Sequence, residues 1–221
     1  MKKPGIEREI IAMRVAREFQ DGDVVNLGIG IPTLASNFIP EGRRITFHTE
    51  NGALGFGSLA EPGQEDIDLT NAGGQFVTLQ PGMSFFHSAD AFAMARGGHV
   101  DITVLGAFQV SEKGDLANWM LPERGVGNVG GAMDLVSGAK KVIVAMEHVS
   151  KNGEPRILKR CAYPLTGIEC VDLVVTDLAV IEVTPQGLVL REVAPGWTAT
   201  EVQRLTEPKL IVAKELREIE L

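Results

Sequence analysis

The stretch ITFHTENGALGFG, residues 45–57, carries an alternating strand pattern into a glycine-rich loop. Ile45, Phe47 and Thr49 share one face of the predicted strand, and the other face ends on Glu50. Open α/β sheets keep reactive groups at the carboxyl ends of their strands, where glycine backbone lets a ligand come close. Glu50 is therefore either a reactive carboxylate or an ordinary solvated glutamate at a turn. The segments around it bear on that choice.

Strands and helices alternate on both sides of this stretch. Helix-type patterns cover residues 6–19, 32–38, 86–96 and 132–139, and strand-type runs cover residues 24–30, 45–49, 76–79, 100–110 and 141–146. Residues 173–183 and 188–193 flank a turn and predict a hairpin before a short helix capped by Thr200. We expect an α/β fold, a three-layer α/β/α arrangement with an open, mainly parallel sheet and a β-rich C-terminal part. The absence of a linker predicts a single domain over residues 1–221.

The composition narrows the classes of function. A net charge of −8 without a basic stripe argues against a nucleic-acid-binding surface. No apolar run approaches membrane-spanning length and the N-terminus lacks a signal-peptide core, so we expect a cytoplasmic chain without membrane contact. Cys161 and Cys170 lack metal-binding spacing and are interpreted as buried free thiols, and the four histidines are scattered. We therefore expect no metal site.

Two glycine-rich segments precede predicted helices. NLGIGIP, residues 26–32, joins a strand to a helix, so its backbone N–H groups are candidates for holding an anion. The dinucleotide pattern GxGxxG fails there because a threonine replaces its last glycine, and the P-loop pattern is absent from the sequence. In GNVGGAMDL, residues 127–135, Gly130 and Gly131 either let a ligand lie against the main chain, with N–H donors for an oxyanion, or allow tight helix packing.

Several motifs occur in the same order as in a known family. NLGIGIPT, TENGALGFG, NAGG, GGAMDLVSGAKKVIVAMEH and CAYPLTG together resemble the β subunit of the class I CoA-transferases. That family includes the 3-oxoacid, acetate–acetoacetate and butyrate–acetoacetate CoA-transferases. The resemblance runs from about residue 5 to about residue 210. It implies exchange of CoA between a short-chain acyl-CoA, such as acetoacetyl-CoA, and a free carboxylate such as acetate, butyrate or succinate.

The resemblance also implies roles for particular residues. Glu50 corresponds to the covalent nucleophile of the family, Asn26 to an asparagine close to it, and Gly130 and Gly131 to the CoA site. Gly28 and Gly30 are expected to take part in substrate binding or oxyanion stabilisation. The implied reaction is a ping-pong exchange through a glutamyl–CoA thioester. It uses CoA as a substrate and requires no cofactor.

An α subunit completes the active site in this family, so the resemblance implies an α partner, with an α2β2 heterotetramer as the expected assembly. Two positions depart from the pattern: Thr49 replaces the commoner serine, and Gly74 stands where animal mitochondrial relatives have lysine. The second departure weakens succinate as a co-substrate. A subunit of a 3-oxoadipate CoA-transferase is one alternative. A non-catalytic domain that binds a small molecule such as a sugar phosphate is another, because fold does not fix function.

Other residues have weaker interpretations. His48 shares a strand face with Glu50, and it either tunes that carboxylate or is a packed strand histidine. Gln109 is either a hydrogen-bond partner of the substrate or part of a turn. We expect Lys140 and Lys141 to form a solvated helix end. The residues expected in the core are Phe85, Phe86, Trp119 and Met120.

Overall fold

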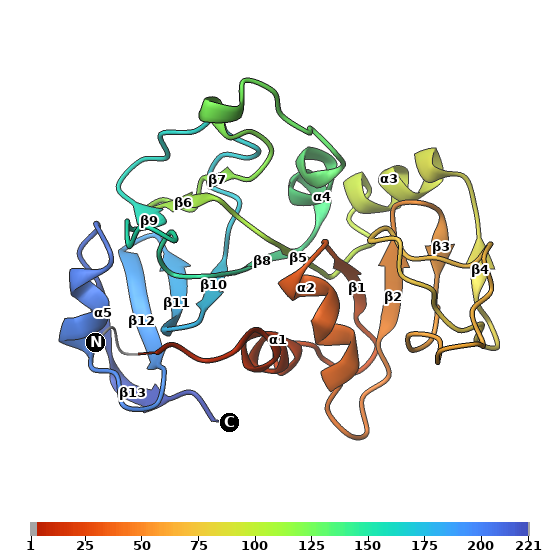
Figure 1. Cartoon of the computed structure of the whole chain (residues 1–221), viewed down its shortest axis with the longest axis horizontal. Helices are drawn as coiled ribbons and strands as arrows, with labels where there is room; N and C mark the ends of the chain where they lie inside the picture. Colours follow the sequence, from red (N-terminus) through yellow and green to blue (C-terminus); the bar gives the residue numbers. More distant parts are fainter. Residues whose placement is uncertain (1–3, 221) are drawn as a thin grey trace.

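The computed structural model describes residues 4–220, which are built around a ten-stranded sheet (Figure 1). The strand order is β13-β12-β11-β10-β8-β5-β1-β2-β3-β4. These strands are β1 (Val24–Leu27), β2 (Thr46–Thr49), β3 (Ala53–Leu54), β4 (Ser84–Phe85), β5 (Ile102–Leu105), β8 (Lys141–Met146), β10 (Leu173–Thr176), β11 (Ala179–Thr184), β12 (Gly187–Val193) and β13 (Ile211–Glu218).

A second sheet of three strands and several helices complete the described part of the chain. The small sheet has the order β7 (Leu116–Ala117), β6 (Gln109–Ser111) and β9 (Ile157–Leu158). The α-helices are α1 (Arg8–Ala16), α2 (Ile31–Leu34), α3 (Ser88–Arg96), α4 (Ala132–Gly138) and α5 (Ala199–Arg204). Two 3-10 helices are η1 (Ala35–Phe38) and η2 (Pro122–Arg124). In residues 4–220, no helix has both the length and the apolar content that crossing a membrane requires.

The central strands β2, β1, β5, β8 and β10 pair in parallel, and helices cover both of their faces. On β8, Val142, Val144 and Met146 belong to one hydrophobic cluster, and Ile143 and Ala145 belong to another. The first cluster includes residues of α3 and α4, and the second includes residues of α1 and α2 (Figure 1). A strand buried on both faces requires near-continuous apolar sequence, as β8 has. The predicted α/β/α layering is confirmed.

The ends of the helices follow local sequence signals. α3 ends where Gly97 follows it, as predicted, and α4 begins directly after Gly131. The prediction for α5 was wrong in its cap, which is Thr198 rather than Thr200. The side chains of Thr198 and Glu201 form a reciprocal capping box, a spacing that satisfies two backbone N–H groups at once.

Three predicted strands differ from the observed ones. The strand expected over residues 24–30 ends at Leu27, because the glycine segment after it turns into α2. The single strand expected over residues 100–110 is divided into β5 and β6, which lie in different sheets. Residues 76–79 form no strand and contribute only isolated bridges, one of them between Leu59 and Val77.

The C-terminal part is β-rich, as predicted. β11 and β12 form the expected hairpin, closed by the pairing of Thr184 with Gly187. The strand β13 was not predicted; it pairs in parallel with β12 across an irregular register between Leu190 and Glu192. Most of β13 is exposed on both faces, so its sequence lacks the alternation that signals a half-buried strand. The single domain expected over residues 1–221 stays a prediction.

Several side chains lie in other environments than expected. Phe85 is 63% exposed, so its assignment to the core was wrong. Lys140 is exposed directly after the C-cap of α4, as expected, and pairs with Asp101. Lys141 instead begins β8, is half-buried and pairs with Glu18, so its assignment to a solvated helix end was wrong. Three more residues expected inside, Phe86, Trp119 and Met120, are half-buried.

Both cysteines are free and half-buried. Burial raises the pKa of the Cys161 thiol to about 12 and that of the Cys170 thiol to about 11. Both thiols are therefore protonated and unreactive at neutral pH.

Candidate active site

The carboxyl ends of β1 and β2 bring two predicted site residues together. The two strands are parallel neighbours with Asn26 opposite His48, and Glu50 directly follows β2. The side-chain Nδ2 of Asn26 donates a hydrogen bond of 3.0 Å to Oε2 of Glu50. Asn26 is fully buried, whereas Glu50 is half-buried. One carboxylate oxygen is thus anchored from inside the protein while the group stays open to solvent.

A buried histidine lies behind this pair. His48 is 1% exposed. Its Nδ1 lies 3.2 Å from Nδ2 of Asn26, and its Nε2 lies 3.2 Å from the carbonyl oxygen of Ala91 in α3. Burial lowers the pKa of His48, against smaller opposite effects of the Ala91 carbonyl and the Glu50 charge. The imidazole is therefore neutral at neutral pH. It is a packed strand histidine that also contacts the amide holding Glu50.

Two short polar side chains tie the Glu50 loop to the segment NAGG, residues 71–74. Oγ1 of Thr49 donates to Oδ1 of Asn51 at 2.7 Å and accepts from the N–H of Ala72 at 2.8 Å. Nδ2 of Asn51 donates to the carbonyl of Thr70 at 2.8 Å. No role was predicted for Thr49 and Asn51, although polar residues on both sides of a candidate acid are a usable signal. A serine hydroxyl at this position would make the same two bonds as Thr49.

Gly52 fixes the path of the chain after Glu50. Its φ is +113°, and a Cβ at this position would collide with the carbonyl oxygen of Phe86. The N–H of Phe86 in turn donates to the carbonyl of Gly52 at 3.0 Å. Only glycine permits this approach of two backbones. The glycine of TENG therefore serves the geometry of the turn.

Gly28 and Gly30 occupy different environments. The N–H of Gly28 donates to the carbonyl of Val104 at 2.8 Å, and its carbonyl accepts from the hydroxyl of Thr33 at 2.7 Å. Both backbone groups of Gly28 are thus used inside the fold. Gly30 is exposed at the start of α2. It borders a hollow of about 410 Å³ whose lining also includes Arg8, Ile29, Thr33, Gly73 and Gln75.

Gly130 and Gly131 directly precede α4. A Cβ on Gly131 would lie 2.5 Å from Cε1 of Phe92, so this glycine lets α4 pack against α3. Gly130 is exposed, and a Cβ there would meet no atom within 4 Å. Neither glycine forms a hydrogen bond with Glu50 among the described residues. Their link to the site runs through α3, where Phe92 follows Ala91.

Neither Gln109 nor, among the described residues, a metal-binding cluster contributes to this site. Gln109 is the first residue of β6, so its interpretation as part of a turn was wrong. Its Oε1 accepts from the N–H groups of Ala162 and Tyr163 at 2.8 and 3.1 Å. A contact between Gln109 and substrate stays a prediction. Within residues 4–220, no group of three or more His, Cys, Asp or Glu side chains is placed to hold a metal ion. The chemistry available at the site is that of a carboxylate, an amide and backbone donors.

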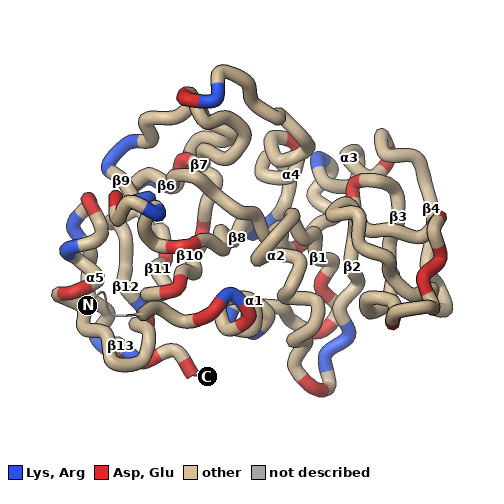
Figure 2. Tube along the Cα trace, in the orientation of Figure 1, with Lys and Arg blue, Asp and Glu red and all other residues tan. Residues whose placement is uncertain are grey.

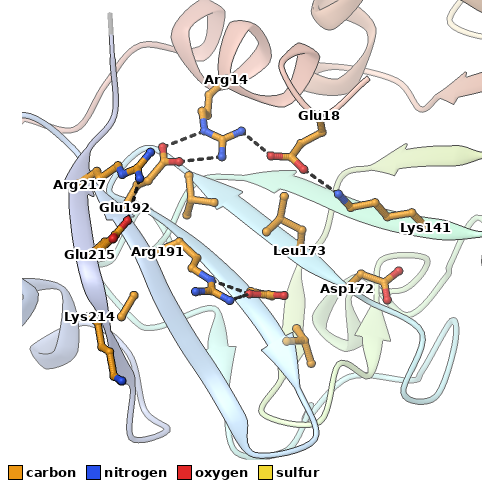
Figure 3. Close-up of a pocket in the computed structure, with 14 residues that line it drawn as sticks. Arg14, Glu18, Lys141, Asp172, Leu173, Arg191, Glu192, Lys214, Glu215 and Arg217 are labelled. Atoms are coloured by element: carbon orange, nitrogen blue, oxygen red, sulfur yellow. Dashed lines mark hydrogen bonds and ion pairs between the residues drawn. The ribbon is translucent and has the colours of Figure 1, made fainter. Parts of the chain in front are cut away.

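Another hollow lies away from this site, between α1 and the strands β8 and β10 to β13 (Figure 3). It measures about 710 Å³ and contains none of the predicted site residues. Arg14 lies at its edge and binds both Glu18 and Glu192, and Lys141 binds Glu18 (Figure 3). These charges satisfy one another, so we attribute the cluster to the attachment of α1 rather than to ligand binding. Elsewhere, basic and acidic residues are interspersed, with acids gathered in residues 61–68 (Figure 2).

Comparison with known proteins identifies the scaffold on which this site lies. Residues 8–205 match the model of the family described as coenzyme A transferase. The chain belongs to the coenzyme A transferase family. It is 53% identical over 207 residues to the B subunit of the 3-oxoadipate CoA-transferase of Pseudomonas putida, covering 93% of this chain and 97% of the relative. It is 50% identical to the B subunit of the succinyl-CoA:3-ketoacid coenzyme A transferase of Helicobacter pylori, covering 93% and 99%.

These matches place the chain among the β-type subunits of CoA-transferase enzymes, as the sequence motifs predicted. Among solved structures, an acyl-CoA transferase of Escherichia coli O157:H7 superposes with a TM-score of 0.77 at 17% identity. The match covers all of this CoA-transferase chain but only 44% of that longer chain. Glutaconate coenzyme A-transferase from Acidaminococcus fermentans superposes with a TM-score of 0.70 at 17% identity, covering 99% and 91%. At such identities these structures show the shared fold alone.

Proposed function

We propose that Glu50 is the covalent nucleophile of a CoA-transferase that exchanges CoA between a short-chain acyl-CoA and a free carboxylate. The observation that carries the proposal is the anchored carboxylate at the end of β2. Oε2 of Glu50 accepts a hydrogen bond from Asn26, and within residues 4–220 no lysine or arginine forms an ion pair with it. A carboxylate that is oriented by a neutral amide, with no cation bound to it, has its oxygen lone pairs available for attack on a carbonyl carbon.

The proposed reaction proceeds in balanced steps. Ionised Glu50 attacks the thioester carbonyl carbon of the acyl-CoA, the C–S bond breaks, and CoA leaves as a thiolate with an acyl–glutamyl anhydride on the enzyme. The thiolate then attacks the Glu50 carbonyl carbon and expels the first acid as a carboxylate, which leaves a glutamyl–CoA thioester. A second carboxylate enters, and the same steps in reverse release a new acyl-CoA. Thioester is exchanged for thioester, so no ATP or redox cofactor enters the balance.

Positioning is the main source of acceleration in this proposal, because a carboxylate is a weak nucleophile. Well-oriented reactants gain about 7–11 kcal/mol over free ones, whereas the loss of one oxyanion donor costs about 3–4 kcal/mol. Asn26 orients Glu50, and the exposed backbone of Gly30 and Gly130, together with the half-buried Gly131, is proposed to contact the acyl-CoA. Gly28 is not proposed as an N–H donor, because its N–H group is bonded to Val104. Its proposed role is to place Gly30.

The acid substrates form a narrower set of proposals. The relatives are named for 3-oxoadipate and for succinyl-CoA with a 3-ketoacid, at 53% and 50% identity. We propose acetoacetyl-CoA or a similar 3-oxoacyl-CoA as donor and acetate, butyrate or succinate as acceptor, with 3-oxoadipate as the alternative acid. An assay of acetoacetyl-CoA consumption against a panel of these carboxylates, each varied up to saturation, ranks them by kcat/KM.

A second subunit completes the proposed enzyme. The relatives are named as B subunits, and we propose an α subunit as partner in a cytoplasmic α2β2 heterotetramer. The purified chain should be inactive alone and active after addition of the α subunit. Full activity of the chain alone, at a purity that excludes a host α subunit, would refute the shared site.

Trapping the intermediate tests the nucleophile directly. The complex is incubated with acetoacetyl-CoA, the thioester is cleaved with borohydride, and the modified peptide is mapped by mass spectrometry. We expect modification of Glu50 in the peptide that contains TENG. Modification at any other residue would overturn the assignment. The absence of any covalent intermediate, with turnover intact, would favour direct transfer and a non-covalent role for the carboxylate.

A further inference from the structure

A chain of buried hydrogen bonds leads from α3 to the carboxylate of Glu50. The carbonyl of Ala91 lies 3.2 Å from Nε2 of His48, and Nδ1 of His48 lies 3.2 Å from Nδ2 of Asn26. Nδ2 of Asn26 in turn donates to Oε2 of Glu50 at 3.0 Å. His48 and Asn26 are fully buried, so water does not compete for the two contacts of the His48 ring, whereas Glu50 at the end of this hydrogen-bond chain is half-buried.

The partners of His48 fix its tautomer. A backbone carbonyl only accepts hydrogen bonds, so the proton of the neutral imidazole lies on Nε2, facing Ala91. Nδ1 then carries a lone pair and accepts from the amide of Asn26. The ring has little freedom to turn away, because it is stacked at 22° against Phe86 with ring centroids 6.3 Å apart.

The tautomer of His48 in turn selects the orientation of the Asn26 amide. Three acceptors surround Nδ2 of Asn26: Oε2 of Glu50, Nδ1 of His48 and, at 3.3 Å, the carbonyl oxygen of His48. On the other side, Oδ1 faces the hydroxyl of Thr103 at 3.4 Å, and a hydroxyl tolerates either orientation because it both donates and accepts. A flipped amide would direct its oxygen at the Glu50 carboxylate, and the two oxygens would repel each other.

We propose that His48 is a positioning residue for Glu50: as the Nε2–H tautomer it holds the Asn26 amide with its N–H directed at the carboxylate. The inference rests on the proposed role of Glu50 as nucleophile. His48 touches no reacting atom in this scheme. Through Asn26, it connects the carboxylate of Glu50 to the backbone of α3.

Two substitutions separate the two bonds of His48. In His48→Asn, the amide oxygen reaches the place of Nδ1 and keeps an acceptor for Asn26. In His48→Gln, the longer side chain reaches the place of Nε2, keeping the donor to Ala91 and losing the acceptor. We expect His48→Gln to lower kcat about 10- to 100-fold with little change in KM, as for a misplaced reacting group. His48→Asn should retain most of kcat even though it leaves a larger cavity.

A second buried histidine provides the matched control. His148 is fully buried between Thr176 and Thr206 and lies outside the proposed site. His148→Asn should lower the melting temperature and leave kcat unchanged. If kcat of the His48 variants follows their melting temperatures, or if His48→Gln equals wild type while His48→Asn is impaired, the positioning role is overturned.

The decisive readout is the rate at which the covalent thioester forms in a single turnover. The αβ complex is mixed with excess acetoacetyl-CoA, quenched at intervals, and the mass of the intact β-type chain is measured. Absence of labelling on Glu50 in the wild type would refute the proposed function itself. Labelling of wild type and His48→Gln at equal rates would refute only the positioning role.

The tautomer has a readout that needs no activity. Long-range ¹H–¹⁵N spectra of the labelled protein distinguish a protonated imidazole nitrogen from one with a free lone pair. We expect His48 to show a protonated Nε2 and an unprotonated Nδ1 at neutral pH. The opposite tautomer would overturn the inference, because Nδ1 would then be a donor facing the Asn26 amide.

Discussion

The Glu50 site and the Arg14 cluster are both polar groups packed against the same sheet, but they differ in whether their carboxylates are paired with cations. In the Arg14 cluster, Nε and Nη2 of Arg14 bind the two carboxylate oxygens of Glu192 at 2.8 Å, and Nη1 binds Glu18 at 2.8 Å. Lys141 binds the other oxygen of Glu18 at 2.6 Å. At the active site, by contrast, the Glu50 carboxylate meets the neutral amide of Asn26.

We infer from this difference that the paired carboxylates of the Arg14 cluster stabilise the fold, whereas the carboxylate of Glu50, which has no cation partner among the described residues, is available for catalysis. Although burial opposes it, hydrogen bonds from Lys141 and Arg14 lower the pKa of Glu18. A carboxylate in such a cluster is stabilised as an anion and is a poor nucleophile. Glu50 is oriented without being neutralised. In the described part of the chain, pairing with cations thus distinguishes the acids of the Arg14 cluster from Glu50, whereas burial does not, since all of them are half-buried.

The largest expected effect is on turnover at Glu50. Glu50→Gln keeps an oxygen that accepts from Asn26, so the free energy of unfolding should change by less than about 0.5 kcal/mol. An amide is a far poorer nucleophile, and kcat should fall on the order of a thousandfold or more. Acetoacetyl-CoA consumption and urea unfolding measure the two quantities. Wild-type kcat in this variant, once mass spectrometry has excluded deamidation back to Glu50, would show that the comparison assigns the chemistry to the wrong carboxylate.

The Arg14 cluster should show the reverse response, with a loss of stability and intact turnover. Arg14→Met removes a buried cation from the half-buried Glu18 and Glu192, and only Glu18 keeps a second cation, Lys141. Breaking a buried pair by removing one partner costs about 3 kcal/mol or more, which urea unfolding should detect. The kcat of the folded complex should be unchanged.

Arg17 is the matched control for this prediction. It lies one turn further along the chain and pairs with Glu220, whose side chain is 82% exposed. Exposed pairs contribute about 0.2–1 kcal/mol, so Arg17→Met should have a small effect. Equal destabilisation by the two variants would mean that the Arg14 cluster is no more structural than an ordinary surface pair.

Much of this arrangement could be predicted from the sequence where one local pattern decides the outcome. The near-continuous apolar run of β8 indicated a parallel central strand, and Glu50 at a strand end indicated the site. The contact between Asn26 and Glu50 was expected only from the family resemblance, since nothing in either segment fixes the register of β1 and β2. β13 escaped prediction because exposure on both faces removes its periodicity.

The supporting contacts could not be predicted because they join distant parts of the chain. The Ala91 carbonyl that receives His48 belongs to a helix 43 residues away, and a backbone acceptor leaves no mark in the sequence. Phe92 is likewise distant from Gly131 in the sequence. Its ring packs against Gly131 and leaves no room for a side chain there unless the ring shifts. Glycine motifs therefore indicated close approach correctly, without indicating whether the neighbour was a ligand or another side chain.

The two buried histidines extend the comparison to acid pH. Burial lowers the pKa of His148 to about 4, below the ordinary value of 6.5. The unfolded state then binds more protons between these values, so stability is fully present above pH 6.5 and falls as the pH drops toward 4. At pH 5 the loss from His148 should be about 2 kcal/mol relative to pH 7.

Urea unfolding of wild type and His148→Asn at pH 7 and pH 5 isolates this contribution. The lowered pKa of His48 acts in the same direction, but it is present in both proteins and cancels in the difference. The variant should lose less stability than the wild type between the two pH values. Equal losses would show that His148 does not titrate in this window and would remove it as the source of the acid sensitivity.

The smallest expected effect concerns Gly131 and decides whether its loop belongs to the chemistry or to the fold. A methyl group at this position would lie 2.5 Å from the ring of Phe92, which is half-buried and able to shift. Gly131→Ala should therefore cost about 1 kcal/mol, the low end for overpacking, or about 2–4 °C in melting temperature for a chain of this size.

The double variant Gly131→Ala with Phe92→Leu separates the two roles of Gly131. Leucine is smaller than phenylalanine and makes room for the added methyl group, so stability should recover relative to Phe92→Leu alone if Gly131 serves packing. A role in CoA binding predicts instead that KM for acetoacetyl-CoA stays raised in both Gly131 variants, because replacing the glycine would also disturb the backbone proposed to contact the acyl-CoA. Recovery of both stability and KM would assign Gly131 to the packing of α4 on α3 and leave Gly130 as the glycine of that loop that meets the acyl-CoA.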